Sequence, residues 1–391
     1  MYTGADHAGK IKGPSFSVNG ILFAAIRGMK WGGCCLLTVL LACCTGAGSG
    51  QSVIAYYTGN AADIDRYPID RLTHLVWGFC SLKQGRMCVG ARADSLAIRR
   101  LVRLKKKYPA LKILVALGGW GGCRDCSATF ATAAGRDSFA ASVAEMVQHF
   151  GVDGVDIDWE YPSLAAFPGH RYAAEDKQHF TQLLRALRDR LGPDREITFA
   201  AAGFAPYLQG SIDWVDAVRV ADRIHLMTYD FIGSHHPTTG HHAALFSTSG
   251  QEESADHAVR YLDSLGVPLG KVAIGVAFYG REFDGASGYN QGLYQAATFK
   301  RFLSMRQLRR AYGPAEGYTS YWDDMAQAPW RYNSGKKIFI TYDDERSVAA
   351  KTRYARAKKL NGIFFWQLAL DIPHGGLTDR IAEGLRSPGH R

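Results

Sequence analysis

Residues 153–160 read Asp-Gly-Val-Asp-Ile-Asp-Trp-Glu, with acidic and apolar residues in alternation. Side chains on a β-strand point alternately to opposite faces, so a strand here places Asp156, Asp158 and Glu160 on one face. Carboxyl groups held this close disfavour each other's ionisation. The row therefore predicts at least one carboxyl group that stays protonated near neutral pH, as a general acid must.

Short apolar stretches of this kind alternate with amphipathic helical stretches from residue 51 onward, as in a parallel sheet with crossover helices. The predicted strands cover residues 53–57, 74–79, 113–117, 154–159, 197–202, 223–229, 272–278 and 362–366. Eight such strands predict an α/β fold of the closed (β/α)8 TIM-barrel type. Active sites of such barrels lie at the C-terminal ends of the strands, so we expect Asp156 deepest and Glu160 at the mouth. Asp153, one pleat out of phase, is expected to be structural.

The stretch between the seventh and eighth predicted strands is much longer than one helix and its loops require. Residues 283–340 are rich in Tyr, Trp and Gly and predict a small α+β insertion subdomain before the last helix and strand. The barrel then comprises residues 51–282 and 341–385. We expect the aromatic residues of the insertion to fill its core, with some lining a groove; they are Tyr318, Tyr321, Trp322, Trp330 and Tyr332.

The first 50 residues have the pattern of an export signal, and Met29 is an alternative start. The apolar run at 32–44 is too short to span a bilayer. Residues 40–43 resemble a bacterial lipoprotein box, which would leave Cys43 lipidated, whereas ordinary cleavage near 47–49 is the competing interpretation. We expect a secreted or extracytoplasmic protein that contacts a membrane only if it carries a lipid.

Four cysteines follow this leader, and an even number in an exported chain predicts disulfides. We expect local pairs, Cys80 with Cys88 and Cys123 with Cys126, among the three connectivities that four cysteines allow. The Cys123-x-x-Cys126 spacing also occurs in redox and zinc motifs, but no second pair at matching spacing accompanies it.

The net charge of +10 is spread along the chain without a basic run, which argues against a nucleic-acid partner. His235-His236 and His241-His242 resemble a metal cluster, yet their place after the sixth strand favours a polar loop wall. We therefore expect a monomer with no metal and no cofactor.

Several motifs in order resemble the chitinases of glycoside hydrolase family 18. Residues 153–160 match the DxxDxDxE signature of that family, and the resemblance covers nearly all of residues 52–372. The supporting motifs are Tyr56-Tyr57, Gly118-Gly119-Trp120, Met227-Thr-Tyr229-Asp230, Tyr279-Gly-Arg281 and Trp366.

The resemblance implies a retaining mechanism in which the N-acetyl carbonyl of the substrate is the nucleophile. Glu160 would be the general acid and base, Asp158 would orient the acetamido group, Asp156 would share a proton, and Tyr229 would hydrogen-bond the acetamido oxygen. Chitin or N-acetylglucosamine oligosaccharides would be the substrates. The residues implied in substrate binding are Tyr56, Phe79, Gly119, Trp120, Met227, Asp230, Tyr279, Arg281 and Trp366.

One position departs from the family pattern. Ala116 stands where the third-strand motif usually has a serine whose hydroxyl group hydrogen-bonds the inner aspartate. We therefore expect Asp156 to have one donor fewer, with Tyr56 or a water molecule left to serve it, and an altered pH profile.

Other functions fit the same residues. An endo-β-N-acetylglucosaminidase acting on glycoprotein glycans would share the acid row, although the insertion favours a groove for a linear polymer. A chitin-binding lectin of this fold would typically lack the terminal acid, which is present as Glu160. The acid row could also be a solvated edge or a divalent-cation site, but solvated acids would not alternate with Val and Ile on a buried strand.

Overall fold

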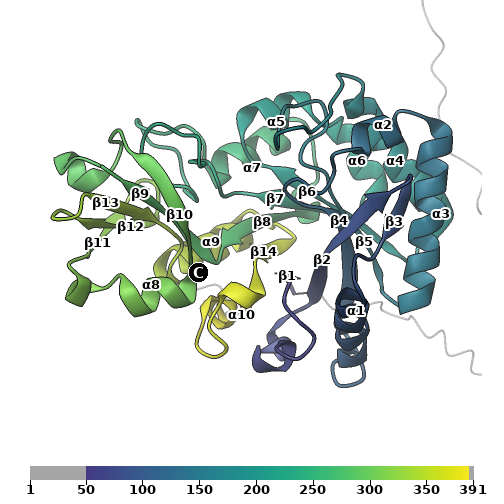
Figure 1. Ribbon diagram of the computed structural model, residues 1–391, viewed down its shortest axis with the longest axis horizontal. Coiled ribbons are helices and arrows are strands. Elements are labelled where there is room, and N and C mark those ends of the chain that lie inside the picture. Colours follow the sequence, from purple (N-terminus) through teal and green to yellow (C-terminus); the bar gives the residue numbers. More distant parts are fainter. Residues whose placement is uncertain (1–49, 387–391) are drawn as a thin grey trace, which may run out of the picture. The chain divides into compact units, whose positions relative to one another are not determined.

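The computed structural model describes residues 50–386, and within this range a closed barrel of parallel strands forms the centre of the molecule (Figure 1). The strands follow one another in the order β1-β14-β8-β7-β6-β5-β4-β2, and β1 also pairs with β2. This pairing closes the sheet and confirms the predicted (β/α)8 barrel. The barrel strands are β1 (Ser52–Tyr57), β2 (His74–Lys83), β4 (Lys112–Gly118), β5 (Gly154–Asp158), β6 (Glu196–Ala202), β7 (Arg223–Met227), β8 (Val272–Ala277) and β14 (Gly362–Trp366).

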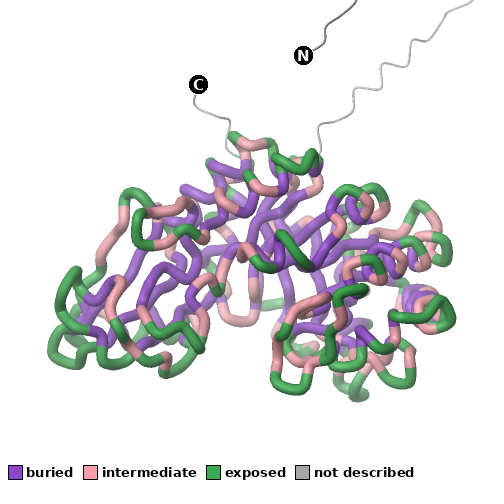
Figure 2. The backbone as a smooth tube through the Cα atoms, turned by 90° about the horizontal axis from the view of Figure 1, so that it is seen from above, coloured by how far each residue is buried: buried purple, intermediate pink, exposed green. Residues whose placement is uncertain are grey.

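Alternation along each strand separates two buried layers. On β1, Ile54 and Tyr56 point into the barrel and pack with Phe364 of β14, whereas Val53 and Ala55 join the layer between the barrel and its helices. β1 is accordingly buried along its whole length, and buried segments form the interior of the molecule (Figure 2). The same alternation directs Asp156 and Asp158 of β5 inward.

Amphipathic helices cover the outside of the barrel. On α1, the residues at helical spacing that face the barrel are buried, namely Ala97, Ile98, Leu101 and Leu104. The helices of the barrel are α1 (Arg92–Leu104), α2 (Cys126–Phe130), α3 (Ala133–Phe150), α4 (Asp176–Leu191), α5 (Ala205–Gly210), α6 (Trp214–Val220), α7 (Ala255–Ser264), α9 (Glu345–Ala357) and α10 (Leu377–Arg386).

A second, antiparallel sheet lies beside the barrel, on the left in Figure 1. Its strand order is β10-β9-β13-β12-β11, and it spans Tyr279 to Thr341. Its elements are β9 (Tyr279–Asp284), β10 (Thr298–Ser304), α8 (Met305–Ala311), β11 (Thr319–Asp323), β12 (Ala328–Asn333) and β13 (Ile338–Thr341). Because β9 starts directly after β8, the insertion begins at the C-terminal end of a barrel strand.

The predicted cysteine pairs have different outcomes. Cys123 and Cys126 form a disulfide at the start of α2, whereas the predicted Cys80–Cys88 pair is wrong, because both thiols are free. β2 extends past the predicted strand and forms a hairpin with β3 (Arg86–Cys88), in which Cys88 lies opposite Ser81. Cys80, one residue earlier, therefore points to the other face, where its Sγ lies 3.6 Å from Sδ of Met146.

The predicted leader, the alternative start at Met29 and the lipidation residue Cys43 lie outside the described residues. Between residues 50 and 386, no helix is long and apolar enough to cross a membrane.

Candidate active site

A groove with a cavity volume of about 1060 Å³ opens at the C-terminal ends of the barrel strands. Strands from all around the barrel contribute to it, and the insertion forms one side through β9, β10 and α8. The predicted site residues that line this groove are Tyr56, Phe79, Gly119, Trp120, Asp158, Glu160, Met227, Tyr229, Asp230, Tyr279, Arg281 and Trp366. Asp156 lies beneath them.

The acid row descends from the groove into the barrel. Glu160 is partly exposed, Asp158 is 5% exposed and Asp156 is fully buried. Asp153 lies apart at the entrance of β5, where it accepts hydrogen bonds from Nζ of Lys105 at 2.7 Å and from the backbone N–H of Ile113 at 2.8 Å. Asp153 thus anchors the start of the strand.

Asp156 has more partners than the sequence predicted. The Tyr56 hydroxyl donates to its Oδ2 at 2.7 Å, as expected. Two further partners were not predicted: the Thr198 hydroxyl donates to Oδ1 at 2.6 Å, and Nδ1 of His225 lies 3.2 Å from the same oxygen. Ala116 is the neighbour of Asp156 on the adjacent strand β4 and offers only a methyl group.

Asp158 is buried, and one of its carboxylate oxygens receives no hydrogen bond from the described residues. Among residues 50–386, its Oδ1 has no hydrogen-bond partner. Burial, followed by the nearby charges of Glu160 and Asp156, raises the pKa of Asp158 well above its usual value. A ligand N–H group could satisfy this oxygen.

Glu160 has the properties of a general acid. Desolvation at the base of the groove raises its pKa to about 7; the Tyr161 side chain opposes this shift and the charge of Asp230 adds to it. A carboxyl group with a pKa near the working pH can both give and accept a proton. Tyr161, which follows Glu160, also lines the groove and was not among the predicted site residues.

The Tyr229 ring lies beside the acid row because β8 has a glycine at the facing position. A Cβ atom on Gly275 would lie 2.6 Å from Cε1 of Tyr229, so any larger residue would displace the ring. Burial and the charges of Asp158 and Asp230 raise the pKa of Tyr229 well above 10, which keeps its hydroxyl group available as a donor.

Asp230 joins the barrel to the insertion. Its Oδ1 accepts from the Tyr279 hydroxyl at 2.6 Å and from Nε of Arg281 at 2.8 Å. Burial alone would raise the pKa of Asp230, but hydrogen bonding by His242 and the Arg281 charge lower it to about 2. Within the described chain, Nη1 of Arg281 is buried without a partner, so it remains free to donate to a ligand.

Aromatic rings form the walls of the groove. Trp366 stacks on Phe79 with ring centroids 5.5 Å apart and packs against Tyr56 at 5.8 Å. Phe79 fits there because Gly119 has no side chain: a Cβ atom at Gly119 would lie 2.5 Å from the ring. Trp120 also lines the groove; it is 56% exposed, and its ring centroid lies 6.3 Å from that of Tyr161.

The four histidines after β7 divide into two pairs. His235 and His236 line the groove, as the predicted polar wall requires. The prediction is wrong for His241 and His242, which are buried: Nε2 of His241 lies 3.1 Å from Oδ2 of Asp323, and Nδ1 of His242 lies 3.6 Å from Oδ1 of Asp230. Carboxylates on the insertion and on the loop after β7 hold them inside.

The insertion contributes different residues to the groove from those expected. Trp330 and Tyr332 are buried in its core, and Tyr321 stacks on Trp330. Besides Tyr279 and Arg281, its groove residues are Phe302, Leu303, Ser304 and Gln307. Phe302 is 55% exposed above the Arg281 guanidinium, with 4.6 Å between Cζ and the ring centroid.

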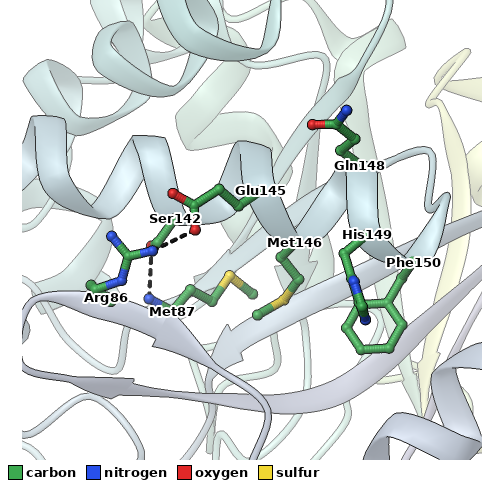
Figure 3. A pocket seen from close by; sticks show the side chains of 8 residues that line it. All are labelled: Arg86, Met87, Ser142, Glu145, Met146, Gln148, His149 and Phe150. Atoms are coloured by element: carbon green, nitrogen blue, oxygen red, sulfur yellow. Dashed lines mark hydrogen bonds and ion pairs between the residues drawn. The ribbon is translucent and has the colours of Figure 1, made fainter.

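A separate pocket of about 520 Å³ lies between β3 and α3 (Figure 3). Arg86 and Glu145 pair across it, and Met87 and Met146 line its base. Ser142 donates to the Phe139 carbonyl and accepts from the Met87 backbone N–H, so the buried hydroxyl group of this pocket is already paired. None of the predicted site residues lines this pocket.

Known proteins share this architecture. Chitinase A1 of Niallia circulans is 36% identical over 321 residues, which cover 73% of this chain and 46% of that relative. Chitinase B of Serratia marcescens is 30% identical, with 78% and 74% covered. A solved family 18 N-acetylglucosaminidase of Paenibacillus barengoltzii is 32% identical with a TM-score of 0.78, and the match covers 85% of this chain and 99% of that structure.

This chain therefore spans less than half the length of the first of these relatives. The family model described as Glycosyl hydrolases family 18 matches residues 52–371, which include all eight barrel strands, the acid row and the insertion. The barrel, the groove and this match together show that the chain belongs to family 18 of the glycosyl hydrolases.

Proposed function

We propose that the protein hydrolyses the β-1,4 links between N-acetylglucosamine units in chitin or its oligosaccharides with retention of configuration. One observation carries the proposal: the same groove is lined by the partly exposed Glu160, with its pKa of about 7, and by the buried Asp158, whose Oδ1 has no partner within residues 50–386. The first can protonate a glycosidic oxygen, and the second can accept an acetamido N–H.

In the proposed reaction, the N-acetyl carbonyl of the substrate attacks the anomeric carbon while Glu160 protonates the leaving oxygen. Asp158 holds the acetamido N–H and stabilises the positive oxazolinium intermediate; such electrostatic stabilisation is usually the largest catalytic contribution. Tyr229 donates to the acetamido oxygen. Glu160, now a carboxylate, then deprotonates the water molecule that opens the intermediate.

The walls of the groove supply positioning. Trp366 would stack on the reacting sugar, Trp120 on the sugar of the leaving group, and Asp230 and Arg281 would bind sugar hydroxyl groups. Of these, Trp366 packs on Tyr56, next to the acid row, which supports its assignment to the reacting sugar. The Cys123–Cys126 disulfide supports the further proposal that the protein is exported, since disulfides persist in oxidising compartments.

The test compares the protein with its Glu160→Gln variant on N-acetylglucosamine oligosaccharides and on a high-mannose glycopeptide. We expect cleavage of the oligosaccharides and a loss of about 10²–10⁴-fold in kcat for the variant. Cleavage of the glycopeptide alone would identify an endo-β-N-acetylglucosaminidase. Binding without cleavage of either substrate would identify a lectin, and an active Gln variant would contradict the role of Glu160.

Product analysis of the same reactions addresses a second candidate function. The structure from Paenibacillus barengoltzii is named as an N-acetylglucosaminidase, and its match extends over 99% of that chain. Release of single N-acetylglucosamine units from the outset would favour this activity, whereas a ladder of oligosaccharides would favour internal cleavage.

A further inference from the structure

Donors surround the buried Asp156 from three strands. The hydroxyl groups of Tyr56 on β1 and Thr198 on β6 donate to it. Nδ1 of His225 on β7 lies 3.2 Å from its Oδ1 and forms a 2.8 Å hydrogen bond with the Tyr56 hydroxyl group. A fully buried carboxylate is stable only where donors replace its lost hydration. On the side of β4, Ala116 supplies none.

The position of the histidine proton follows from the surroundings of its ring. His225 is fully buried and stacks on Phe364 with centroids 5.3 Å apart, and its Nε2 has no partner within residues 50–386. An N–H at Nε2 would have no acceptor among the described residues, whereas an N–H at Nδ1 can donate to the Tyr56 hydroxyl oxygen, so we place the ring proton on Nδ1. The protons of His225, Tyr56 and Thr198 then all point into the cluster around Asp156.

We propose that His225 is a positioning residue that, together with Tyr56 and Thr198, holds Asp156 as a carboxylate and so keeps the mobile protons of the acid row on Asp158 and Glu160. The inference rests on the proposed function, because it concerns the same acid row. It assigns to the inner aspartate a fixed negative charge that the other two acids experience from below.

The other titratable groups facing His225 do not compete for this role. Tyr56 keeps its proton, because burial and the Asp156 charge raise its pKa well above 10. His74 of β2 also interacts with His225, and burial lowers the pKa of His74 despite its contact with Glu196 at 3.2 Å. Arg223 pairs with the same Glu196 at 2.9 Å, so the Glu196 carboxylate already has a cationic partner.

The test uses a matched pair of variants, His225→Asn and His225→Leu, which have nearly the same shape. The Asn amide nitrogen is bonded to Cγ as Nδ1 of His is, so Asn can keep the donor, whereas Leu removes it. Without the donor, the buried carboxylate of Asp156 loses one of the polar partners that replace its hydration. We expect the acid limb of kcat/KM for an N-acetylglucosamine oligosaccharide to move up by about one to two pH units in the Leu variant.

The Asn variant should keep its acid limb within about half a pH unit of the wild-type position. Thr198→Val, which removes the hydroxyl group at constant shape, should move the limb in the same direction as His225→Leu, and Thr198→Ser should not. This second pair tests the inference even if a histidine variant fails to fold.

A purely structural role gives a different result. Leu and Asn variants that share one acid limb, with kcat/KM lowered evenly at every pH, would overturn the inference. The Glu160→Gln variant is assayed in parallel, and activity of this variant would contradict the proposed function. An inactive Glu160→Gln variant, together with the same acid limb for His225→Leu and His225→Asn, would contradict only the role of His225.

Discussion

Glu160 sets the alkaline limit of the proposed reaction. Its pKa of about 7 means that the protonated form, which the first step needs, is lost as the pH rises through neutrality. We expect kcat/KM to fall above about pH 7. A pH–rate profile measures this limb, and a limb more than about two units higher would contradict the assignment.

Asp230 provides the control for that profile, because its negative charge contributes to the raised pKa of Glu160. Asp230→Asn should therefore move the alkaline limb to lower pH, whatever it does to the maximal rate. An unmoved limb would show that Asp230 acts only on the substrate.

At this scale the sequence predicts what lies on one strand and misses what neighbouring strands bring to it. Alternation along residues 153–160 was enough to order the acids by depth. Thr198 and His225 reach Asp156 only because of the register of β6 and β7, which depends on contacts distant in sequence. Their signal was a polar residue inside an otherwise apolar strand, which demands a buried partner.

Among the elements, β8 holds a glycine on which the position of a site residue depends. Gly275→Ala would place Cβ 2.6 Å from the Tyr229 ring and displace it. Because displacements of about 1 Å can cost about 10²-fold in rate, we expect a loss of 10- to 100-fold in kcat/KM with the fold retained. Steady-state kinetics and a thermal melt measure the two effects.

Gly270→Ala is the matched control, since no atom lies within 4 Å of the Cβ position at Gly270. Its kinetics should equal those of the wild type. A Gly275→Ala variant with the same kinetics as this control would show that the Tyr229 position does not matter for the reaction.

The β2–β3 hairpin shows why predicting elements is easier than predicting their ends. The apolar run at 74–79 indicated a strand, but its continuation to Lys83 pairs through residues with no strand signal. The predicted Cys80–Cys88 bond failed for this reason: the hairpin register, not the spacing, decides which side chains face each other.

At the scale of the whole molecule, the acid row makes the free energy of unfolding depend on pH. The folded state holds the Glu160 proton more tightly than an exposed glutamate would, with a pKa of about 7 against 4.5. The stability that the raised pKa of Glu160 contributes is therefore fully present below about pH 4.5. It is lost as the pH rises through 7, where the buried carboxyl group must ionise. Glu160→Gln cannot ionise and should escape this decline.

We expect the Tm difference between Glu160→Gln and the wild type to be larger at about pH 8 than at about pH 5. Differential scanning calorimetry at both pH values measures it. An equal difference at the two pH values would indicate that Glu160 is no harder to ionise in the folded protein than in the unfolded chain.

The barrel as a whole was predictable, because eight apolar strands separated by amphipathic helices have few other ways to bury both faces of a parallel sheet. The insertion was predictable only as a compact α+β segment. Its strand order places β9 between β10 and β13, and such antiparallel pairings depend on contacts that no local pattern encodes.

Strand β9 also limits how far this architecture can be rebuilt in parts. Tyr279 and Arg281 belong to the first strand of the insertion, yet both bind Asp230 on the loop after β7 of the barrel. An engineer who replaced the subdomain with a short turn would remove two of the donors that hold this carboxylate. A replacement of the subdomain should therefore begin after Arg281, so that the start of β9 stays with the barrel.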